Sequence, residues 1–580
     1  MRQILDRRAL PWLGLVFILL VFVISVVRLH PTNYFGLTQD DTIYFSSAKA
    51  LADGHGYVLP SVPETPRATK FPFLYPWILS WVWRWNPSFP ANVSDAVGVT
   101  VAFGCAFLTV AFLFFKQLNA FNDLEALLLT LFCALHPVVR VYSANVLSDI
   151  PFAAFALAVI VLSNRTLKRN SGVALAALCG VLAGLTMCVR VLGAPVAAGI
   201  LIAMLLRRAW RKAAVFSACV ATFVATLAWR VLFTAPSQAP VRLSTCSAVW
   251  QRTWMFYTSY VSLWRISATH AGIFWQTVKQ NGLLLLLQPG IYFADPRFIR
   301  PSDLGAVFTC VLSAIAFAGV FRLTRKTGWQ PIHFSLAFYV VPLLFWPYPL
   351  AERCLLPFLP LFAAGIWSDW KHLARQIGQS FDRSQPPMER WVATFLTVVL
   401  VVFATGICWA QKSNIRLISR EGQERGSLLH EKREAYSWLR TNTPPGSRAI
   451  AYEDVILYLY SGRQALRPIA FSPAALYDPS LLEHDVACLT SGARAIGANY
   501  WVMSDDDFGI EWTEATSTAI GRENQLGDSL PELFRSSSGH VRVYGLKTAS
   551  GSDLLVRQDD FLSISDPPSS SKWEPKAPPP

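Results

Sequence analysis

Apolar residues in this chain gather in long runs that shorter polar segments separate. The runs cover residues 10–27, 94–115, 124–139, 150–163, 172–189, 191–206, 213–234, 303–321, 332–347, 354–368 and 391–411. A helix needs roughly 20 apolar residues to cross a membrane, so the pattern predicts about 11 spans. Arg28-Leu29-His30 follows the first run, where a signal peptide would need small residues for cleavage. We therefore interpret the first run as a retained span.

Two of the polar segments, residues 28–93 and 235–302, are long. The first contains an aromatic run, Phe71 to Leu79, which is too short and too rich in Pro to span a membrane. We expect this run to lie along the membrane surface. The second segment contains Leu283 to Leu287, another candidate for an interfacial or re-entrant stretch.

The pattern changes after residue 411. Residues 412–561 are typical of a small α/β domain, whereas residues 562–580 are rich in Ser and Pro and are expected to be disordered. The predicted elements of this tail are helices Glu431–Arg440 and Val455–Tyr460 and strands Arg448–Tyr452, Tyr500–Met503 and Val541–Leu546. The predicted fold class is thus a polytopic α-helical membrane protein, with a transmembrane domain over residues 1–411 and a C-terminal small soluble α/β domain.

Charge excludes several classes of protein. Charged residues make up 15% of the 580 residues, whereas soluble proteins average about 25%. The net charge of +14 comes from the apolar part, because the tail carries a small acidic excess. A nucleic-acid partner would require a basic face with interleaved polar and aromatic residues. Here the basic residues lie between apolar runs, so no nucleic-acid partner is expected.

The basic residues also predict how the chain is oriented. Clusters of Lys and Arg precede the first run and follow the fourth, sixth, eighth and tenth. If every run crosses the membrane, these five clusters share one side, which the excess of Lys and Arg marks as cytoplasmic. We therefore expect a cytoplasmic N-terminus, with residues 28–93, 235–302 and the whole tail on the outer side.

The ten cysteines suggest neither a zinc site nor a dense disulfide framework. Most lie in or beside apolar runs and are interpreted as small buried side chains, and only Cys246 and Cys488 fall in clearly polar sequence. The chain has no C-x-x-C pair.

The first outer segment carries the most informative acids, Asp40 and Asp41. They begin a predicted helix on which Asp41, Tyr44 and Ala48 share one face. One interpretation is structural, with Asp40 capping the helix and Asp41 favouring its dipole. The other is chemical, because adjacent carboxylates raise a pKa and suit one of them to general-base work, or both to a cation.

A third acid and several cations are expected on the same side of the membrane. Asp149 opens the fourth span, where an acid can also serve as a helix cap. The cations are Lys70, Arg140, Arg190 and Arg353, and each could instead reach towards lipid headgroups. Together these acids and cations could hold a phosphate and activate a hydroxyl.

These residues resemble motifs of the GT-C membrane glycosyltransferases. The acid pair after the first span, followed by Tyr44 and Leu51-x-x-Gly54-x-Gly56-Tyr57, is similar to their first outer loop. The likeness is greatest to the bacterial group that includes aminoarabinose transferases, protein O-mannosyltransferases and rhizobial core sugar transferases. Four further stretches carry the resemblance: Lys70-Phe71-Pro72 with Tyr75-Pro76, Leu147 to Phe152, Arg353 with Leu356-Pro357 and Leu359-Pro360, and Tyr458 to Arg463 in the tail. Phe71 and Cys354 depart from the usual Pro and Tyr.

The resemblance implies inverting transfer of a sugar from a polyprenyl-phosphate donor to a hydroxyl of a glycan, lipid or protein. Asp40 would be the base with Asp41 as its partner or substitute, Asp149 would orient the acceptor or another residue, and Lys70 and Arg353 would hold the donor phosphate. Tyr44, Tyr75, Arg190 and Tyr348 would line the substrate site. No cofactor is required, although Asp40, Asp41 and Asp149 could bind a divalent cation through oxygen. The outer side would be the periplasmic face of the cell (inner) membrane.

Two other functions fit a polytopic protein. A transporter or flippase would show repeats and charged residues near the middle of its spans, whereas the charged candidates here gather at one face. A sensor would not need about 11 spans to anchor its tail. The tail itself is expected to dock the acceptor or act as a lid, and its Asp505-Asp506-Asp507 sequence is interpreted as a solvated acidic turn.

Overall fold

The structure is a computed structural model, and parts of the chain are described. The described residues are 2–36, 38–233, 257, 271–294, 304–348, 350–380, 387–468, 488, 493, 496–507, 520–521 and 524–546. Much of the second outer segment, 235–302, and the whole end of the chain expected to be disordered, 562–580, lie outside the described residues.

Each predicted span overlaps one helix or two adjoining helices. The helices concerned are α1 (Arg2–Val27), α4 (Val93–Gln117), α5 (Asp123–Leu135) with α6 (Pro137–Ser143), α7 (Asp149–Thr166), α8 (Val173–Val189), α9 (Gly193–Leu206), α10 (Trp210–Phe233), α14 (Leu304–Thr327), α15 (Pro331–Leu344), α16 (Leu359–Ser380) and α17 (Pro387–Asn442). Within the described residues, five are long and apolar enough to cross a membrane, and the bent pair α5 and α6 makes a sixth. The multi-pass architecture is therefore confirmed, whereas a count of 11 stays a prediction.

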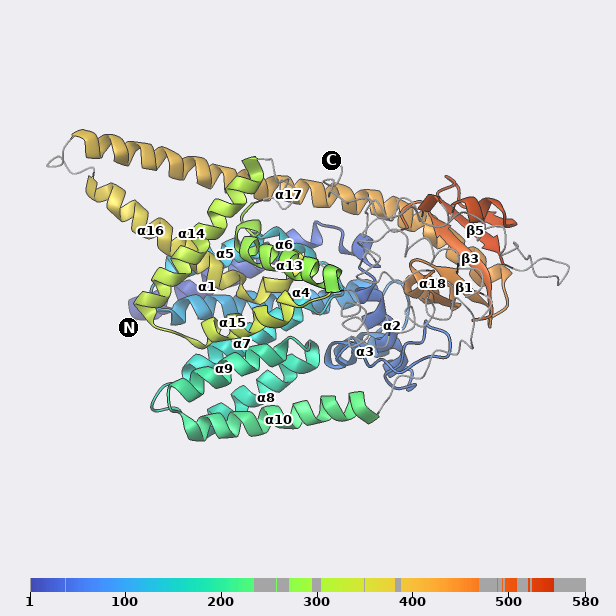
Figure 1. Ribbon diagram of the computed structural model, residues 1–580, viewed down its shortest axis with the longest axis horizontal. Coiled ribbons are helices and arrows are strands. Elements are labelled where there is room, and N and C mark those ends of the chain that lie inside the picture. The colour runs from blue at the N-terminus through green and yellow to red at the C-terminus, as the bar shows by residue number, and fades with distance from the viewer. Residues whose placement is uncertain are drawn as a thin grey trace.

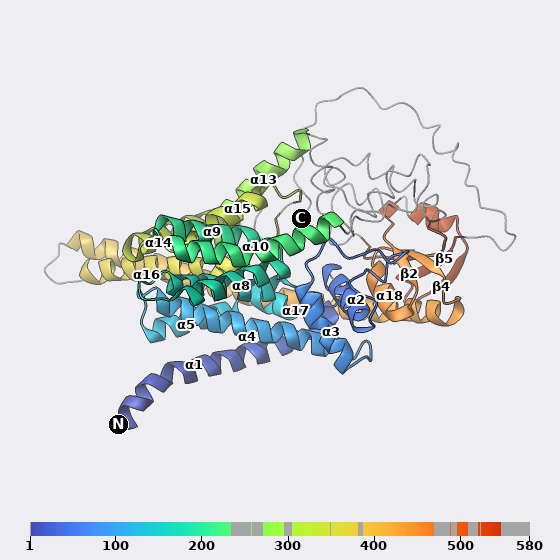
Figure 2. The same cartoon turned by 90° about the horizontal axis from the view of Figure 1, so that it is seen from below.

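The helices form an elongated bundle with distinct ends. The N-terminus, the α9–α10 connection and the start of α17 lie at one end, and a small sheet lies at the other (Figure 1). The view from below shows α2 (Asp40–Ala52) and α3 (Leu74–Trp85) between the bundle and the sheet domain (Figure 2). The acid-bearing outer segment therefore lies where the membrane domain and the tail meet.

Glycines let two helix pairs approach closely within the bundle. A Cβ atom on Gly319 of α14 would lie 2.0 Å from the carbonyl oxygen of Gly365 on α16, and one on Gly199 of α9 would lie 2.3 Å from the backbone nitrogen of Ser335 on α15. Small residues at such contacts bring backbones together, which favours association of helices within a membrane.

The outer segments form helices of their own. After a short 3-10 turn at Pro31–Tyr34, α2 carries the acid pair and α3 carries the aromatic run. Helix α3 buries Tyr75 and Leu79 but exposes Trp77, Trp81 and Trp85. This amphipathic helix is suited to a membrane surface, where we predicted it would lie. Residues 283–287 lie within α13 (Ala271–Ile291), which packs against α14 and α15.

The tail forms a five-stranded sheet of order β2-β1-β3-β5-β4. Strands β1 (Arg448–Ala451), β3 (Ala498–Ser504) and β5 (Val541–Gly545) match the predicted strands, whereas β2 (Gln464–Leu466) and β4 (Glu532–Arg535) were not expected. Strand β1 pairs in parallel with both β2 and β3, while β5 pairs antiparallel with β3 and β4. Helix α18 (Asp454–Ser461) joins β1 to β2.

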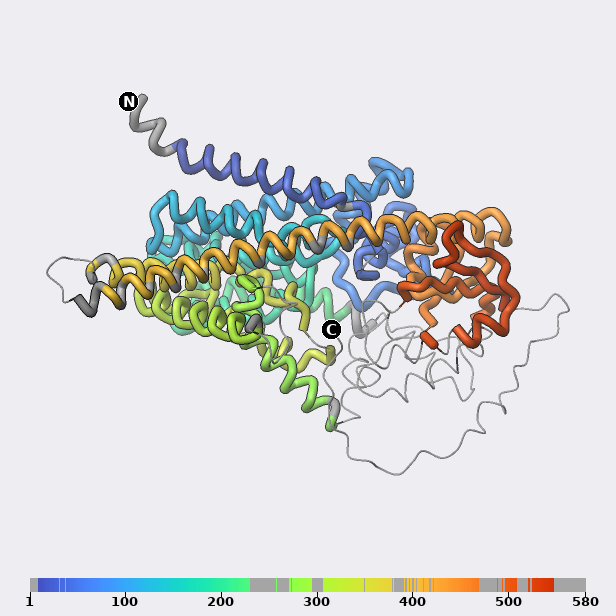
Figure 3. Tube along the Cα trace, turned by 90° about the horizontal axis from the view of Figure 1, so that it is seen from above, coloured from blue at the N-terminus to red at the C-terminus, as the bar shows by residue number. Residues whose placement is uncertain are grey.

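The last span and the first tail helix are one helix. Helix α17 has 56 residues, so it is about 84 Å long at 1.5 Å per residue. It runs along the bundle and into the sheet domain (Figure 3). The separate helix expected at 431–440 and the domain boundary at 412 therefore both fall inside a continuous helix. Polar residues after 411 ended the apolar run but did not break the helix, because Gln, Lys, Glu and Arg are good helix formers.

One apolar core joins the first outer segment to the tail. Buried side chains of α2 and α3 belong to the same cluster as those of β1, α18 and β3. The rings of Phe89 and Tyr460 meet edge to face at 4.6 Å. The backbone N–H of Ala465 in β2 donates to the carbonyl of Ser61 at 2.9 Å. The sheet is thus packed onto the outer segment rather than tethered beside it.

Candidate active site

Asp40 begins α2 and does not cap it. The N-cap residue is Gln39, and its side chain makes no capping hydrogen bond. Asp40 keeps about a quarter of its side chain exposed, and its Oδ2 lies 3.6 Å from Nη2 of Arg353. The capping interpretation is therefore wrong for this residue, although both acids still lie at the favourable end of the helix dipole. Asp40 is thus a partly exposed carboxylate that faces a cation.

Asp41 points the other way and is fully buried. Its Oδ2 accepts the backbone N–H of Gly36 at 2.7 Å, and its Oδ1 accepts that of Thr42 at 2.8 Å. Burial raises the pKa of Asp41 from 3.8 to about 7, although the two hydrogen bonds and the charge of Arg425 act against this shift. Asp41 therefore fixes the turn before α2, and Asp40 is the acid of the pair that faces the cations.

Asp149 is buried at the start of α7, and it does not cap that helix either. Arg190 lies in the sharp turn between α8 and α9, and its Nη2 donates to Oδ2 of Asp149 at 2.9 Å. Its Nη1 lies 2.9 Å from Oδ1 but is not aligned for a hydrogen bond. A buried carboxylate needs such a partner, because an unpaired charge away from water is costly.

Arg353 lies between Asp40 and Asp149. It belongs to the short helix η3 (Glu352–Phe358), and its Nη1 lies 3.7 Å from Oδ2 of Asp149. Both ion-pair distances are longer than a hydrogen bond, and within the described part of the chain Nη1 has no hydrogen-bond partner. The guanidinium is therefore held by two acids at distances longer than a hydrogen bond, and its buried Nη1 is left unsaturated.

A chain of hydroxyl groups connects α2 to Arg190. Tyr44 shares a hydrogen bond of 2.9 Å with Ser148, and Nε of Arg190 donates to the same Ser148 oxygen at 2.8 Å. The ring of Tyr75 packs edge to face on Tyr44 at 5.5 Å, and its hydroxyl bonds to Thr100 at 2.8 Å. The predicted residues Tyr44, Tyr75 and Arg190 thus meet around the first turn of α7.

Lys70 lies near Asp40 but is largely removed from water. Its side chain is 8% exposed, and its Nζ lies 5.1 Å from the centre of the Phe71 ring. Burial lowers the pKa of Lys70 to about 8, although the charge of Asp40 acts to raise it. Tyr348 is half-buried in the segment before η3.

The three acids do not make a metal-binding group. No set of three His, Cys, Asp or Glu side chains in the described ranges lies close enough to hold a metal ion. The oxygens of Asp41 accept two backbone N–H groups, and those of Asp149 face two arginines. The residues present therefore do not fit the divalent cation that Asp40, Asp41 and Asp149 were thought able to bind.

One protein-family model matches part of the chain. The sequence model of the dolichyl-phosphate-mannose-protein mannosyltransferase family matches residues 70–233, a stretch that carries Lys70, Tyr75, Asp149 and Arg190. The resemblance to the GT-C membrane glycosyltransferases is confirmed. A comparison with proteins of curated function gave no match.

Three solved structures of this kind are similar to the chain. The oligosaccharyltransferase of Archaeoglobus fulgidus in its apo form is 12% identical over 84% of this chain and 70% of that one, with a TM-score of 0.48. ArnT from Cupriavidus metallidurans in the apo state is 12% identical over 87% and 93% of the two chains, with a TM-score of 0.45. ArnT bound to undecaprenyl phosphate is 12% identical over 91% and 97%, with a TM-score of 0.47.

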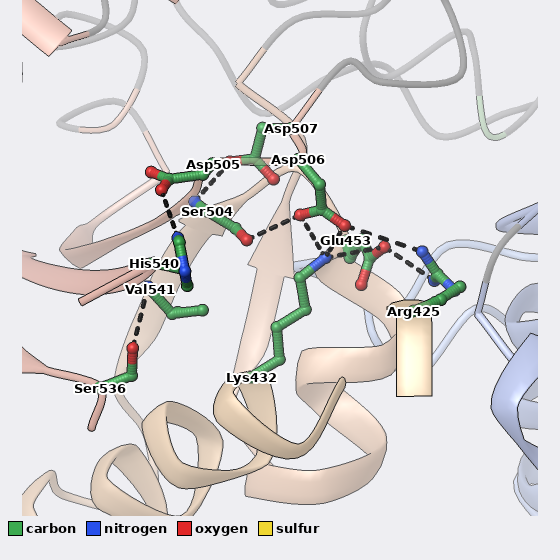
Figure 4. Close-up of polar contacts among 10 residues, drawn as sticks. All are labelled: Arg425, Lys432, Glu453, Ser504, Asp505, Asp506, Asp507, Ser536, His540 and Val541. Carbon is green, nitrogen blue, oxygen red and sulfur yellow. Dashed lines mark hydrogen bonds and ion pairs between the residues drawn. The ribbon is translucent and has the colours of Figure 1, made fainter. Parts of the chain in front are cut away.

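The acidic turn Asp505-Asp506-Asp507 of the tail is less solvated than the sequence predicts. Lys432 of α17 lies 2.7 Å from Oδ1 of Asp506 and 3.1 Å from Oε1 of Glu453 (Figure 4). Arg425 pairs with the same Glu453 oxygen at 2.9 Å. Asp507 is also buried, and burial raises its pKa to about 8. Of the three acids, Asp505 alone is largely exposed. These ion pairs connect α17 to the sheet domain, and the sequence did not predict them.

Sequence reasoning also missed residues that surround the predicted ones. Ser148 precedes Asp149 and forms hydrogen bonds with both Tyr44 and Arg190. Its position next to Asp149 in the motif was the sequence signal that could have identified it. Gln39 precedes Asp40 and binds the tail, but a lone Gln carries no pattern. Tyr142 donates to Glu352, the neighbour of Arg353, at 2.8 Å. Arg140, interpreted as reaching for lipid, instead donates to the carbonyl of Ser25 at 2.8 Å.

Proposed function

We propose that the chain is an inverting membrane glycosyltransferase, which moves one sugar from a polyprenyl-phosphate donor to a hydroxyl acceptor on the outer face of the membrane. The observation that carries the proposal is the position of Arg353. It joins an acid of the first outer helix to an acid of α7, and one of its nitrogens has no hydrogen-bond partner among the described residues. The site thus combines a base with an unsaturated cation.

The chemistry follows from these positions. Asp40 accepts the proton of the acceptor hydroxyl as its oxygen attacks the anomeric carbon from the side opposite the phosphate. The bond between that carbon and the phosphate oxygen breaks, and its electron pair leaves with the lipid phosphate. Arg353 and Lys70 stabilise the negative charge that develops there. Attack from the opposite side inverts the anomeric configuration.

Asp149 and Arg190 act as positioning residues in this proposal. Asp149 faces the guanidinium groups of both Arg190 and Arg353. Arg190 reaches Tyr44 through Ser148, so the arrangement holds the start of α7 against α2. Asp41 supports Asp40 by fixing the preceding turn rather than by replacing it as base.

An outer location of this site has two supports. The basic clusters predict a cytoplasmic N-terminus, and the sheet domain lies at the opposite end of the bundle (Figure 1). Cys488 of the tail is buried and disulfide-bonded. Disulfides persist mainly in oxidising compartments such as the periplasm.

The test is sugar transfer in native membranes, which hold the acceptor, from a panel of radiolabelled lipid-phosphate sugars. Asp40→Asn should lower turnover about 100-fold to 10,000-fold, the usual worth of a general base. The matched control is Asp53→Asn, because Asp53 is an exposed acid at the other end of α2 that pairs with Lys49. Equal turnover by wild type and Asp40→Asn would remove Asp40 as the base. Absence of transfer by wild type from every donor would overturn the proposal.

A further inference from the structure

The tail reaches the candidate base through Gln39. The side-chain Nε2 of Gln39 donates to Oδ1 of Asp454 at 2.9 Å. Its Oε1 accepts from Nη1 of Arg467 at 2.6 Å. Both polar ends of Gln39 are therefore held by residues more than 400 positions away in the sequence, and the next residue along the chain is Asp40.

The topology of the sheet explains why Asp454 and Arg467 meet. Asp454 follows β1 and Arg467 follows β2, and these strands are parallel neighbours. The carboxyl ends of parallel strands lie at the same edge of a sheet, so the two side chains emerge together. Asp454 is fully buried, and its second oxygen accepts from the hydroxyl of Tyr257 at 2.5 Å. Helix α18, which Asp454 begins, contacts α2 directly.

The backbone at Gln39 depends on these contacts. Gln39 has φ 56° and ψ −37°, a conformation that side-chain-bearing residues rarely adopt. Such strain persists only where the surroundings hold it in place. Here the carbonyl of Gln39 also accepts from the hydroxyl of Thr42 at 2.8 Å and from the backbone N–H of Ile43 at 3.0 Å. Gln39 therefore sets the direction in which the chain enters α2.

We infer that Gln39 is a positioning residue, through which Asp454 and Arg467 of the tail hold Asp40 in reach of Arg353. This inference rests on the proposed function and extends it, because it makes the tail part of the catalytic apparatus rather than a detachable lid. A misplacement of about 1 Å in a reacting group can lower a rate about 100-fold. The geometry of Gln39 is thus expected to affect turnover more than donor affinity.

The experiment uses the full chain and two variants that each disturb the junction between the tail and the first outer segment. Gln39→Ala removes the side-chain contacts with Asp454 and Arg467, together with a weaker one to the Tyr257 hydroxyl. Arg448→Gln is the matched control, because Arg448 pairs with Glu64 at 2.9 Å across the same junction and donates to the carbonyl of Ile496 rather than to Gln39 or Asp40. Gln39→Ala should lower kcat about 10-fold to 100-fold with little change in KM for the lipid-phosphate donor. Arg448→Gln should leave both values unchanged.

A second readout does not depend on the reaction. Hydrogen exchange of the first turn of α2, reported by the Ile43 amide that bonds to Gln39, should be at least 10-fold faster in Gln39→Ala than in wild type or Arg448→Gln. Faster exchange in a protein that transfers no sugar would overturn the proposed function and support the positioning role. Unchanged exchange, or a change confined to KM, would overturn the positioning role.

Reciprocal substitution guards against simple misfolding. Gln39→Glu alone sets a carboxylate against Asp454, and Asp454→Asn alone removes an acceptor from Tyr257. In the double variant, the amide introduced at position 454 can donate to the carboxylate introduced at position 39. Arg467 still has a carboxylate oxygen at position 39 to bind. If Gln39 acts by position, the double variant should regain at least 10-fold of the kcat lost by Gln39→Glu. Additive losses would contradict the inference.

Discussion

At the scale of the residue, the environment of each acid separates two neighbours that the sequence leaves equivalent. Asp41 is buried beneath backbone N–H groups, whereas Asp40 is partly exposed and faces Arg353. The sequence placed both at the start of a helix, and that prediction is confirmed. It could not say which one faces the cations, because the strained backbone at Gln39 decides this and depends on residues of the tail.

The pKa of Lys70 predicts a pH dependence. Because burial lowers this pKa to about 8, the ammonium is charged below pH 8 and loses its charge as the pH rises past that value. The groups that act on it electrostatically are Asp40 and Arg467. We expect kcat/KM for the lipid-phosphate donor to fall about tenfold per pH unit above 8. Lys70→Arg should keep its activity to a higher pH, since arginine stays protonated. Identical profiles for the two proteins would exclude Lys70 as a phosphate ligand.

At the scale of the element, helix positions follow the apolar runs, but helix ends and close contacts do not. The sequence predicted the helices because the length of an apolar run can be read from consecutive residues. It predicted a domain boundary at residue 412, inside α17, because the apolar run ends there although the helix continues. It also missed β2 and β4, which have three and four residues and gain their order from neighbouring strands.

The contact between α14 and α16 gives a prediction on stability. Gly319→Ala should lower the free energy of unfolding in detergent by about 1–3 kcal/mol, because its Cβ would meet the backbone of Gly365. Gly98→Ala is the control, since a Cβ at that exposed helical position meets nothing within 4 Å. Thermal unfolding of the purified variants measures both. A Gly319→Ala protein as stable as Gly98→Ala would contradict the close packing of these helices.

At the scale of the whole molecule, the sequence predicted a membrane domain and an outer α/β domain but not how they join. The apolar cluster common to both, the strand edge bonded to Ser61 and the bridge at Gln39 all link residues far apart in the chain. Local patterns carry no signal for such contacts. The tail thus packs onto the first outer segment, and its role in docking the acceptor or as a lid stays a prediction.

The orientation of the molecule can be tested directly. Asp528→Cys places a thiol on the exposed surface of the tail, and Arg169→Cys places one in the connection between α7 and α8. In intact cells a membrane-impermeant maleimide should label the first variant but not the second, which should react after lysis. The unsubstituted protein gives the background of the native cysteines. Labelling with the opposite preference would place the candidate site on the cytoplasmic side.

The shared core has a consequence for biosynthesis. The first outer segment leaves the ribosome early, but the sheet that covers its apolar face follows about 400 residues later, which takes roughly 20 to 80 seconds at 5–20 residues per second. During that interval Ile43, Phe45 and their neighbours await a partner that has not yet been synthesised. A chain interrupted before the tail would display this surface permanently. Quality-control proteases would therefore encounter a truncated product as an unfolded one, even with every membrane helix in place.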